Sequence, residues 1–376
     1  MDLKRKYSIL IVGASSNPGG IEAFLKNNLE KFNKEKFKLT FLSYTGQNWA
    51  YQNELKNKVL KLCLPSRNKH YLTYRKKIND FYKANGSQFD CIWFNLIDLT
   101  NIDMIKAAHK YGIKKIIVHA HNSKLLNPTI YHRLQHYFNK KIVPKYATNL
   151  WACSETASNF FYPNTMDKRV KIINNAILPE SFSFNKNKRI QIRDKYNLND
   201  RFVIGNVGRL EEQKNQKLAI DIIKRLSDQI PNLRLVIVGQ GSKFQELKTQ
   251  VEKYNLENKV LFVGVQKDMQ AWYSSFDLFL FPSLYEGLSV ASLEAQANGL
   301  PILASEEIIP DNSKINANLY TISLKSDIDE WVDKVLGIYK SGYNRIPFSK
   351  IADKYIEKGF DIRYESKKLE ELIGSN

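Results

Sequence analysis

Two glutamates, Glu286 and Glu294, stand eight positions apart in the stretch FPSLYEGLSVASLEAQANGLP, Phe281 to Pro301. The run FDLFLF, residues 276–281, leads into this stretch and predicts a buried strand. A helix is expected from about Leu288 to Asn298, closed by Gly299. A helix N-terminus offers free amides to an anion, and a carboxylate accepts two hydrogen bonds from a vicinal diol. A nucleotide sugar, with a diphosphate between two hydroxyl-bearing groups, fits this pattern. The alternative is that Glu286 caps the helix and Glu294 faces solvent.

Two cations follow another predicted strand. Arg209 and Lys214 lie in GNVGRLEEQKNQ, directly after a Val-Gly pair. Positive side chains at this position suit a leaving diphosphate, because they stabilise the negative charge that develops on it. The alternative is that both are surface charges at the start of a helix.

Gly19 and Gly20, in SSNPGGIEAF, follow the first predicted strand, YSILIVGA. Glycines here let the backbone approach a phosphate or an acceptor closely. The stretch matches neither a Walker loop nor a Gly-x-Gly-x-x-Gly fingerprint, and a plain turn is the alternative.

His119 and His121 end the predicted strand KKIIVHAH and share one of its faces, since strand side chains alternate. An imidazole at this strand end can hydrogen-bond a sugar or a phosphate. His121 is favoured because it is nearer the loop. His119 remains an alternative, and either residue could belong to the core.

No metal or cofactor is expected. His132 and His136 are spaced as in a zinc-binding helix, but no third ligand accompanies them. Asp327 and Asp329 are interpreted as a helix start. Three cysteines far apart in the sequence indicate neither a disulfide framework nor a thiolate site, which fits a reducing cytosol.

The elements that position these residues alternate as strands and helices in two successive series. This rhythm predicts two α/β domains with doubly wound parallel sheets. A linker is expected at Ala176 to Arg189, where periodicity is lost. Ligands of open parallel sheets bind beyond the carboxyl ends of the strands, so two facing domains imply a binding cleft.

The net charge of +19 is concentrated in the first half. Residues 1–180 hold 29 Lys and Arg against 12 Asp and Glu, a balance of +17, and the remaining residues hold 28 against 26, a balance of +2. Such a field attracts nucleic acid, anionic lipid or phosphorylated substrates. No apolar run of 18 residues is present, and the apolar N-terminal run is interpreted as a first strand rather than a signal peptide.

The segment SRNKHYLTYRKKINDFYKA, residues 66–84, places Tyr71, Tyr74, Ile78 and Phe81 in a helical stripe. The stripe is interleaved with the cations Lys69, Arg75, Lys76, Lys77 and Lys83. This pattern is typical of a helix lying on an anionic membrane. The alternative is a helix packed on its own domain with a basic outer side.

Together these motifs resemble family 4 retaining glycosyltransferases, which have the two-domain GT-B fold. EGLSVASLEAQANGLPI resembles the family's E-x7-E segment. GNVGRLEEQKNQ, IVGQGSKFQEL, VLFVGVQKDMQAWYSSFDLFLFPS and SSNPGGIEAF resemble its other loops in the expected order, so the likeness spans nearly the whole chain. The His-x-His element and the segment Ala-Cys-Ser-Glu point to the exopolysaccharide and capsule branch.

The resemblance assigns roles to the site residues. Glu286 would contact the donor sugar and Glu294 the ribose, while Arg209 and Lys214 would hold the diphosphate. His121 and Glu286 would position the sugar, and the remaining donor-binding positions would contribute largely through backbone groups: Gly20, Gly241, Val265, Gly287, Leu288 and Ser289. Gly19 and Gly20 would form the acceptor or phosphate loop.

The resemblance also implies domains and a function. It predicts an N-terminal acceptor domain at 1–180, a C-terminal nucleotide-sugar domain at 190–350, and a helical segment at 351–376 that crosses back. We expect metal-independent, retaining transfer of a hexosyl or N-acetylhexosaminyl group, most simply from a UDP-sugar, to a glycan hydroxyl, with a lipid-linked acceptor in cell-surface polysaccharide assembly. The expected location is the cytoplasm, at the inner membrane face.

Three alternatives remain from other classes. A nucleotide-sugar epimerase would share the fold and the donor. A non-catalytic partner subunit of a glycosyltransferase would keep the fold without the chemistry. A nucleic-acid-binding module has only the charge in its favour, since no recognised motif for it is present, and we expect no nucleic-acid partner.

Overall fold

A computed structural model describes residues 5–17, 19–125, 128–286 and 289–375. Contacts divide the chain into two compact units: Met1–Ala176 with Ile362–Asn376, and Ile177–Asp361. The boundary falls at the start of the predicted linker. The predicted last segment, 351–376, is divided between the two units at residue 361.

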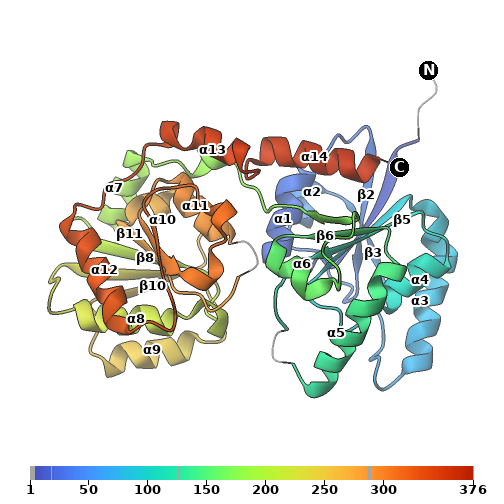
Figure 1. Cartoon of the computed structure of the whole chain (residues 1–376), viewed down its shortest axis with the longest axis horizontal. Helices are drawn as coiled ribbons and strands as arrows, with labels where there is room; N and C mark the ends of the chain where they lie inside the picture. Colours follow the sequence, from blue (N-terminus) through green and yellow to red (C-terminus); the bar gives the residue numbers. More distant parts are fainter. Residues whose placement is uncertain (1–4, 18, 126–127, 287–288, 376) are drawn as a thin grey trace. The chain divides into compact units, whose positions relative to one another are not determined.

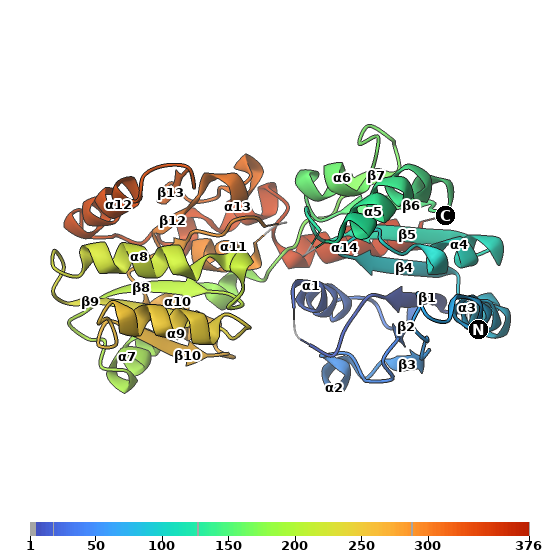
Figure 2. The same ribbon diagram turned by 90° about the horizontal axis from the view of Figure 1, so that it is seen from below.

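The first unit is built on a parallel sheet of seven strands among the described residues, in the order β3-β2-β1-β4-β5-β6-β7. Figure 2 shows this order running from the bottom to the top of the unit. The order reverses beside β1, which creates the switch point at which such sheets bind ligands. The strands are β1 (Tyr7–Val12), β2 (Phe37–Ser43), β3 (Lys58–Lys61), β4 (Cys91–Leu96), β5 (Lys115–Ala120), β6 (Asn149–Ala152) and β7 (Val170–Ile172).

Successive side chains of these strands point to opposite faces of the sheet and contribute to two hydrophobic cores, one on each face. In β1, Leu10 and Val12 join one core, and Ile9 and Ile11 join the other. Helix α14 packs beside α1 on the second face, with Leu369 and Ile373 in that core (Figure 1). The helices are α1 (Gly20–Leu29), α2 (Gln52–Leu55), α3 (Tyr71–Asn85), α4 (Asp103–Lys110), α5 (Ile130–Ile142), α6 (Glu155–Phe161) and α14 (Ile362–Gly374).

Helix α3 contains most of the segment that the sequence suggested for membrane binding. Tyr74, Ile78 and Phe81 are buried in the first core, while Tyr71 remains exposed. Three of the four stripe residues therefore face the protein. The prediction that this stripe lies on a membrane is wrong, and the alternative of a helix packed on its own domain describes α3.

The second unit holds a parallel sheet of six strands in the described part of the chain, in the order β10-β9-β8-β11-β12-β13. Helices α8, α9 and α12 contribute to the core on one face, and α7, α10 and α11 to the core on the other (Figure 1). The strands are β8 (Phe202–Val207), β9 (Leu233–Val238), β10 (Val260–Gly264), β11 (Leu278–Phe281), β12 (Ile302–Ser305) and β13 (Leu319–Ile322); the helices are α7 (Lys186–Lys195), α8 (Gln216–Leu226), α9 (Phe244–Lys253), α10 (Met269–Ser275), α11 (Val290–Ala297), α12 (Ile328–Lys340) and α13 (Ala352–Glu357).

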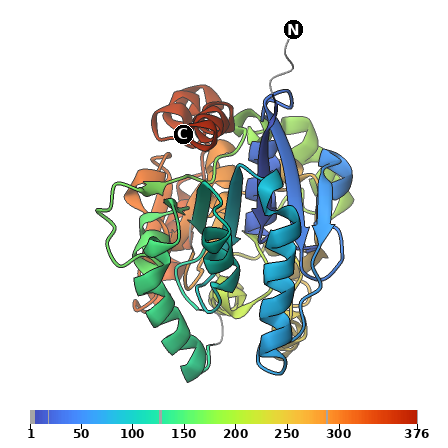
Figure 3. The ribbon, with the colours of Figure 1, turned by 90° about the vertical axis from the view of Figure 1, so that its right-hand side faces the viewer.

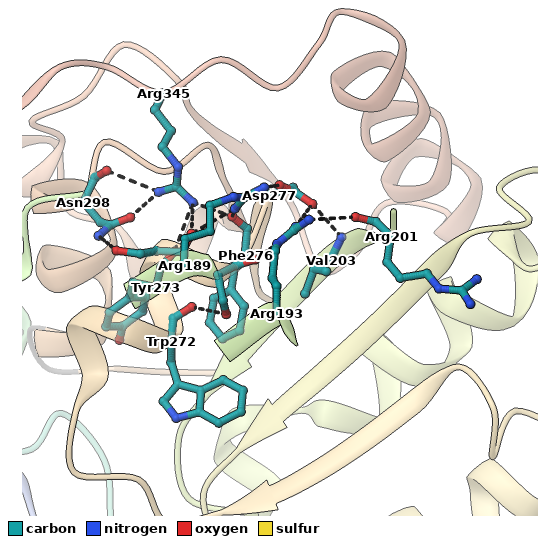
Figure 4. Close-up of polar contacts among 12 residues, drawn as sticks. Arg189, Arg193, Arg201, Val203, Trp272, Tyr273, Phe276, Asp277, Asn298 and Arg345 are labelled. Carbon is teal, nitrogen blue, oxygen red and sulfur yellow. Dashed lines mark hydrogen bonds and ion pairs between the residues drawn. The ribbon is translucent and has the colours of Figure 1, made fainter. Parts of the chain in front are cut away.

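A buried polar network fixes the turn between α10 and β11 (Figure 4). Arg189 and Arg193 of α7 both bond the carboxylate of Asp277. Arg345 donates to the carbonyls of Tyr273, Ser274 and Phe276 and also to Asn298, which follows α11. Burial and the neighbouring arginines lower the pKa of Arg345 to about 9. The network thus joins the ends of α10 and α11.

Within the described ranges, no helix is both long enough and apolar enough to cross a membrane. Those same residues contain no group of three or more His, Cys, Asp or Glu side chains arranged to hold a metal ion. Asp327 caps the start of α12 by accepting from the amide of Asp329, as the sequence predicted. His136 receives the amide of Leu99 at Nδ1 and contacts the carbonyl of Phe160 through Nε2.

Candidate functional site

The loops that follow β8 and β9 pack closely at the carboxyl end of the second unit's sheet. Gly239 has φ +139°, and a Cβ there would lie 2.0 Å from the carbonyl oxygen of Gly208. A Cβ on Gly241 would lie 2.4 Å from the carbonyl oxygen of Leu210. Only glycine fits such contacts. Gly241, a predicted donor-binding position, is therefore required by the packing of the two loops.

The loop after β8 is also tied to the loop after β11. The amide of Leu284 donates to the carbonyl of Gln213 at 2.8 Å, and the Gln213 side chain donates to the carbonyl of Tyr285 at 2.9 Å. Asn215 donates to the carbonyl of Pro282 at 3.1 Å. These bonds bring the 3₁₀ turn η4 (Glu212–Lys214) against the residues that precede α11.

Lys214 and Glu286 form an ion pair at this junction. Nζ of Lys214 lies 2.6 Å from Oε1 of Glu286, and the two side chains are only 14% and 9% exposed. The ammonium also lies over the ring of Phe281, 4.9 Å from its centroid. A buried pair of this kind is held in one geometry, because separating the charges would leave each one desolvated. Two residues to which the sequence gave separate roles are thus in direct contact.

Arg209 lies apart from that pair, with an exposed side chain at the start of the same loop. Its carbonyl accepts from the side chain of Gln216 at 3.1 Å. The pKa of nearby Glu211 is lowered, mainly by hydrogen bonds from Ser242 and in smaller part by the charge of Arg209. The described residues thus give this loop one solvent-facing cation and one cation engaged in a buried ion pair.

Glu294 lies in α11, where its carboxylate accepts a hydrogen bond from the Tyr273 hydroxyl at 2.9 Å. Burial raises the pKa of Glu294 to about 7, although the Tyr273 bond works in the opposite direction. The carboxyl group therefore changes its charge near neutral pH. Arg345 bonds the Tyr273 carbonyl, so the buried network of Figure 4 holds the partner of Glu294.

Two more of the predicted donor-binding residues, Ser289 and Val265, lie among the described residues of the second unit. Ser289 is the N-cap of α11, where its hydroxyl accepts from the amide of Ser292 at 3.3 Å. Val265 is 63% exposed directly after Gly264, which has φ +68°. Gly287 and Leu288 lie outside the described residues.

In the first unit, His121 lies at the carboxyl end of β5. Its Nε2 is 2.9 Å from Oδ1 of Asn95, while the Asn95 amide nitrogen faces the carbonyls of Val12 and Trp93, each at 3.4 Å. Because the amide nitrogen points to these acceptors, Oδ1 must accept from His121, and the imidazole carries its proton on Nε2. Burial lowers the pKa of His121 to about 3. His121 is a neutral imidazole with its lone pair on Nδ1.

His119 shares the face of His121, as predicted, with the two ring centroids 4.1 Å apart. It is fully buried, and neither of its ring nitrogens has a hydrogen-bond partner among the described residues. Its ring stacks on Trp93 and meets the edge of Phe24. His119 is a core residue, so of the two histidines only His121 reaches the strand-end loops.

The two predicted loop glycines differ in their surroundings. Gly19 is the N-cap of α1, and a Cβ on it would lie 2.9 Å from the carboxylate of Glu22, which accepts from the amide of Ser15. Gly20 opens α1, and a Cβ on it would meet nothing within 4 Å. Packing within the unit therefore does not require a glycine at Gly20.

Three residues that contact or support the predicted site residues were not found from the sequence. Asn95 orients His121, Tyr273 bonds Glu294, and Gly13 has φ +104°, with a Cβ position only 1.9 Å from the Asn95 carbonyl oxygen. The sequence could have indicated Gly13, because a glycine directly after the first predicted strand suggests a turn that requires one. Asn95 and Tyr273 lie within apolar runs, and nothing in the sequence indicated them.

The fold is that of a known class. The chain resembles the crystal structure of Anabaena Alr3699/HepE in complex with UDP and glucose, with a TM-score of 0.79 at 17% identity over 98% of this chain and 100% of that one. Both sheets, with their parallel strands and switch points, are those of a GT-B protein.

Sequence comparison finds relatives among glycosyltransferases. Residues 188–359 match the family described as glycosyl transferases group 1. The chain is 29% identical to the putative glycosyltransferase EpsF of Bacillus subtilis over 94% of this chain and 92% of that protein. Residues 188–359 are thus similar to the group 1 glycosyl transferases, a class of enzyme that the motifs of this chain also resemble.

Two further relatives match shorter parts. The capsular polysaccharide biosynthesis glycosyltransferase CapM of Staphylococcus aureus is 25% identical over 64% of both chains. The UDP-Gal:alpha-D-GlcNAc-diphosphoundecaprenol alpha-1,3-galactosyltransferase of Escherichia coli is 32% identical over 46% of this chain and 45% of its own length.

Proposed function

We propose that the protein transfers a hexosyl or N-acetylhexosaminyl group from a UDP-sugar to a hydroxyl of a lipid-linked glycan during cell-surface polysaccharide assembly. The observation that carries this proposal is the buried Lys214–Glu286 pair, held at 2.6 Å at the carboxyl end of the second sheet. The pair supports the proposal because an ammonium can bind phosphate, a carboxylate can accept from sugar hydroxyls, and both lie at the end of a parallel sheet, where ligands bind.

The nucleotide would occupy the loops after β8, β9 and β10. Glu294 would accept from the ribose hydroxyls, the backbone near Gly241 and Val265 would face the nucleotide, and the amides at Gly287, Leu288 and Ser289 would meet the phosphates. The choice of UDP is supported by the names of relatives, since the Escherichia coli enzyme uses UDP-Gal and the Anabaena structure contains UDP.

In the proposed reaction, a bond forms between the acceptor oxygen and the anomeric carbon as the bond to the diphosphate breaks on the same face. The acceptor proton passes to the departing phosphate oxygen, and the sugar keeps its anomeric configuration. Lys214 and Arg209 would stabilise the developing charge, which makes a divalent ion unnecessary. Glu286 and the neutral imidazole of His121 would orient the sugar hydroxyls.

The acceptor would meet the first unit, near Gly19 and Gly20. A lipid-linked glycan is supported by the acceptor named for the Escherichia coli relative, and a polysaccharide setting by the name of CapM. Such an acceptor places the reaction at the inner face of the cell membrane, which also accommodates the excess positive charge of residues 1–180.

The first test is thermal stabilisation by UDP, GDP and ADP, since a ligand of the folded state raises the melting temperature by mass action. We expect a rise with UDP that is weakened in Glu294→Ala. Glu252→Ala, which removes an exposed carboxylate from α9, is the matched control and should respond like the wild type. The absence of a rise with every nucleotide would overturn the proposal.

A second measurement addresses the chemistry. Incubation with UDP-sugars and a diphosphate-linked lipid acceptor should give a product whose anomeric configuration, read by NMR, equals that of the donor. A protein that binds UDP but yields an epimerised donor, or no product with any acceptor, would favour the epimerase or the partner-subunit alternative.

A further inference from the structure

Helix α5 (Ile130–Ile142) is attached to the first unit through its polar side. His136 is its buried residue, held between the amide of Leu99 and the carbonyl of Phe160. Asn139 donates to the carbonyl of Leu99 at 2.7 Å, and Lys140 donates to the carbonyl of Asn159 at 2.6 Å. The side of α5 that faces the protein is therefore made of hydrogen-bonding groups.

Its apolar residues point the other way. We define the α5 apolar face as five side chains at helical spacing that are at least half exposed: Ile130 at 79%, Tyr131 at 55%, Leu134 at 50%, Tyr137 at 53% and Phe138 at 59%. A helix at a protein surface normally buries such a stripe and exposes its polar side. A contiguous apolar face of this kind marks an interaction surface.

The charges around this face indicate the sign of its partner. None of the residues 104–154 is acidic, and nine of them are Lys or Arg. Arg133 and Lys141 lie exposed on α5 itself, with the Lys141 ammonium 4.2 Å from the centroid of the Tyr137 ring. Aromatic rings and cations beside an aliphatic stripe form the side-chain pattern of a helix at a membrane interface.

The start of α3 extends this surface. Leu72 is 83% exposed, and Tyr71 lies exposed between the guanidinium groups of Arg67 and Arg75. Burial acts to lower the pKa of Arg67, but its ion pair with Asp103 at 2.8 Å raises that pKa, and Tyr131 of α5 contributes to the rise in smaller part. Figure 3 shows both helices, α3 in blue and α5 in green, extending toward the same end of the first unit.

That end is the carboxyl end of the sheet. Helices of a parallel α/β sheet run antiparallel to the strands, so the first turns of α3 and α5 lie on the side where β5 ends at His121. If the exposed apolar residues of α5 and α3 bind a partner at this end, the strand-end loops of the first unit face that partner.

We propose that the α5 apolar face, together with Tyr71 and Leu72, inserts into the interfacial layer of an anionic lipid bilayer. A second copy of this chain would bring an equally basic surface against it, whereas anionic headgroups neutralise Arg133, Lys141 and their neighbours. The inference deepens the proposed function, because it names the surface by which the enzyme would reach a lipid-linked acceptor.

The test is sedimentation of the full chain with vesicles of phosphatidylcholine, alone or mixed with phosphatidylglycerol. We expect binding to the mixed vesicles and little binding to the neutral ones. Leu134→Ser/Phe138→Ser should weaken binding about tenfold or more. Arg133→Glu/Lys141→Glu should weaken it by at least about fivefold per cation, and raised salt should weaken the wild type similarly.

Two variants serve as matched controls. Ile190→Ser/Phe244→Ser removes comparably exposed apolar side chains from the second unit and should bind like the wild type. Phe138→Trp changes the shape of the face but keeps its apolar character, and it should retain binding, because a bilayer tolerates a shape change that a packed protein interface does not. Loss of binding in Phe138→Trp, equal loss in both double serine variants, or no vesicle binding by the wild type would overturn the proposal.

Sedimentation velocity without vesicles tests whether the α5 apolar face binds a second copy of this chain instead of a bilayer. A wild-type dimer that becomes monomeric in Leu134→Ser/Phe138→Ser would assign the face to self-association and overturn the proposal. The UDP melting shift separates this inference from the proposed function. Vesicle binding without a UDP response would support the membrane-binding surface and contradict the proposed transferase. A UDP response without vesicle binding would support the proposed transferase and contradict the membrane-binding surface.

Discussion

The carboxyl ends of the two sheets differ in whether the side chains that lie there are charged or neutral. In the second unit, Lys214 and Glu286 form a buried ion pair, Arg209 faces solvent nearby, and Glu294 changes its charge near neutral pH. In the first unit, the corresponding strand ends carry the neutral His121 and the amide of Asn95. One end is built to hold charge, and the other is built to hold uncharged hydrogen-bonding groups.

This difference suggests a division of labour within the proposed reaction. A diphosphate gains negative charge as it leaves, so fixed cations near it lower the barrier. A sugar hydroxyl stays neutral, and a desolvated neutral imidazole orients it without attracting the diphosphate. Substitutions can remove the charged groups and the neutral groups separately.

The largest expected effect comes from Lys214→Ala. Removing the ammonium takes away the 2.6 Å partner of Glu286 and, in the proposed reaction, the charge stabilisation of the leaving group. We expect kcat to fall about 10²- to 10³-fold. Lys243→Ala, which removes a partly exposed cation from the neighbouring loop, is the control and should change kcat little.

A double-mutant cycle shows whether the pair acts as a unit. If it does, Lys214→Ala/Glu286→Ala will be scarcely worse than either single variant, because the second substitution removes a group that has already lost its function. Fully additive losses would mean that the two residues act separately, as the sequence alone suggested.

The next prediction contrasts two glycines of the first unit. Gly13→Ala forces a Cβ to within 1.9 Å of the Asn95 carbonyl oxygen at φ +104°, so we expect a loss of about 3 kcal/mol of unfolding free energy or more. Gly20→Ala meets open space at a helix start and should leave stability unchanged or raise it by about 0.5–1 kcal/mol. Urea unfolding measures both.

Transfer activity then tests the role of Gly20. If backbone at Gly20 approaches a substrate, Gly20→Ala will raise KM for that substrate while the fold stays intact. A variant with wild-type stability and wild-type kinetics would show that Gly20 belongs to a plain turn.

His121→Ala should lower kcat about tenfold to a hundredfold and leave UDP affinity unchanged, because the imidazole is expected to contact the sugar and not the nucleotide. The pKa of His121 is about 3, so the pH profile of the wild-type rate should show no change near neutral pH that is due to protonation of His121. Asn95→Asp places a carboxylate beside Nε2 and raises that pKa. A new pH-dependent limb should then appear, and a pH profile identical to that of the wild type would contradict the assigned contact.

The sequence predicted the strand ends and helix starts well, because local chemistry determines them. The helix expected at about Leu288 to Asn298 is α11, Val290–Ala297, which Gly299 follows with φ +70°, and Asp327 caps α12. Side-chain partners across the fold were not predictable. The contact between Lys214 and Glu286 depends on how two loops, 72 residues apart in the chain, meet.

Helices α3 and α5 show a second limit. Both have apolar residues at helical spacing next to cations, so periodicity describes them alike. Packing separates them: Ile78 and Phe81 of α3 enter the core, while α5 inserts His136 and leaves Leu134 and Phe138 outside. Periodicity identifies a stripe, but only the fold decides which side of the helix faces the protein.

The smallest expected effect concerns Glu294 and is a pH dependence of stability. Its pKa is about 7 in the folded protein, above the value of 4.5 for an ordinary glutamate. Between these two values the unfolded chain releases the proton and the folded protein keeps it, so the wild type loses stability as pH rises. Glu294→Gln keeps an acceptor for Tyr273 and cannot ionise.

The stability advantage of Glu294→Gln over the wild type should therefore be near zero at the acid end, grow as pH rises through this window, and level off above about pH 7, at about 1–3 kcal/mol. Urea unfolding of both proteins across the window measures it. Tyr273→Phe removes the bond that favours the ionised form, so its window should reach to higher pH. A difference that does not change with pH would mean that Glu294 ionises normally, and the contrast between a charge-changing end and a neutral end would then rest on Lys214 and Glu286 alone.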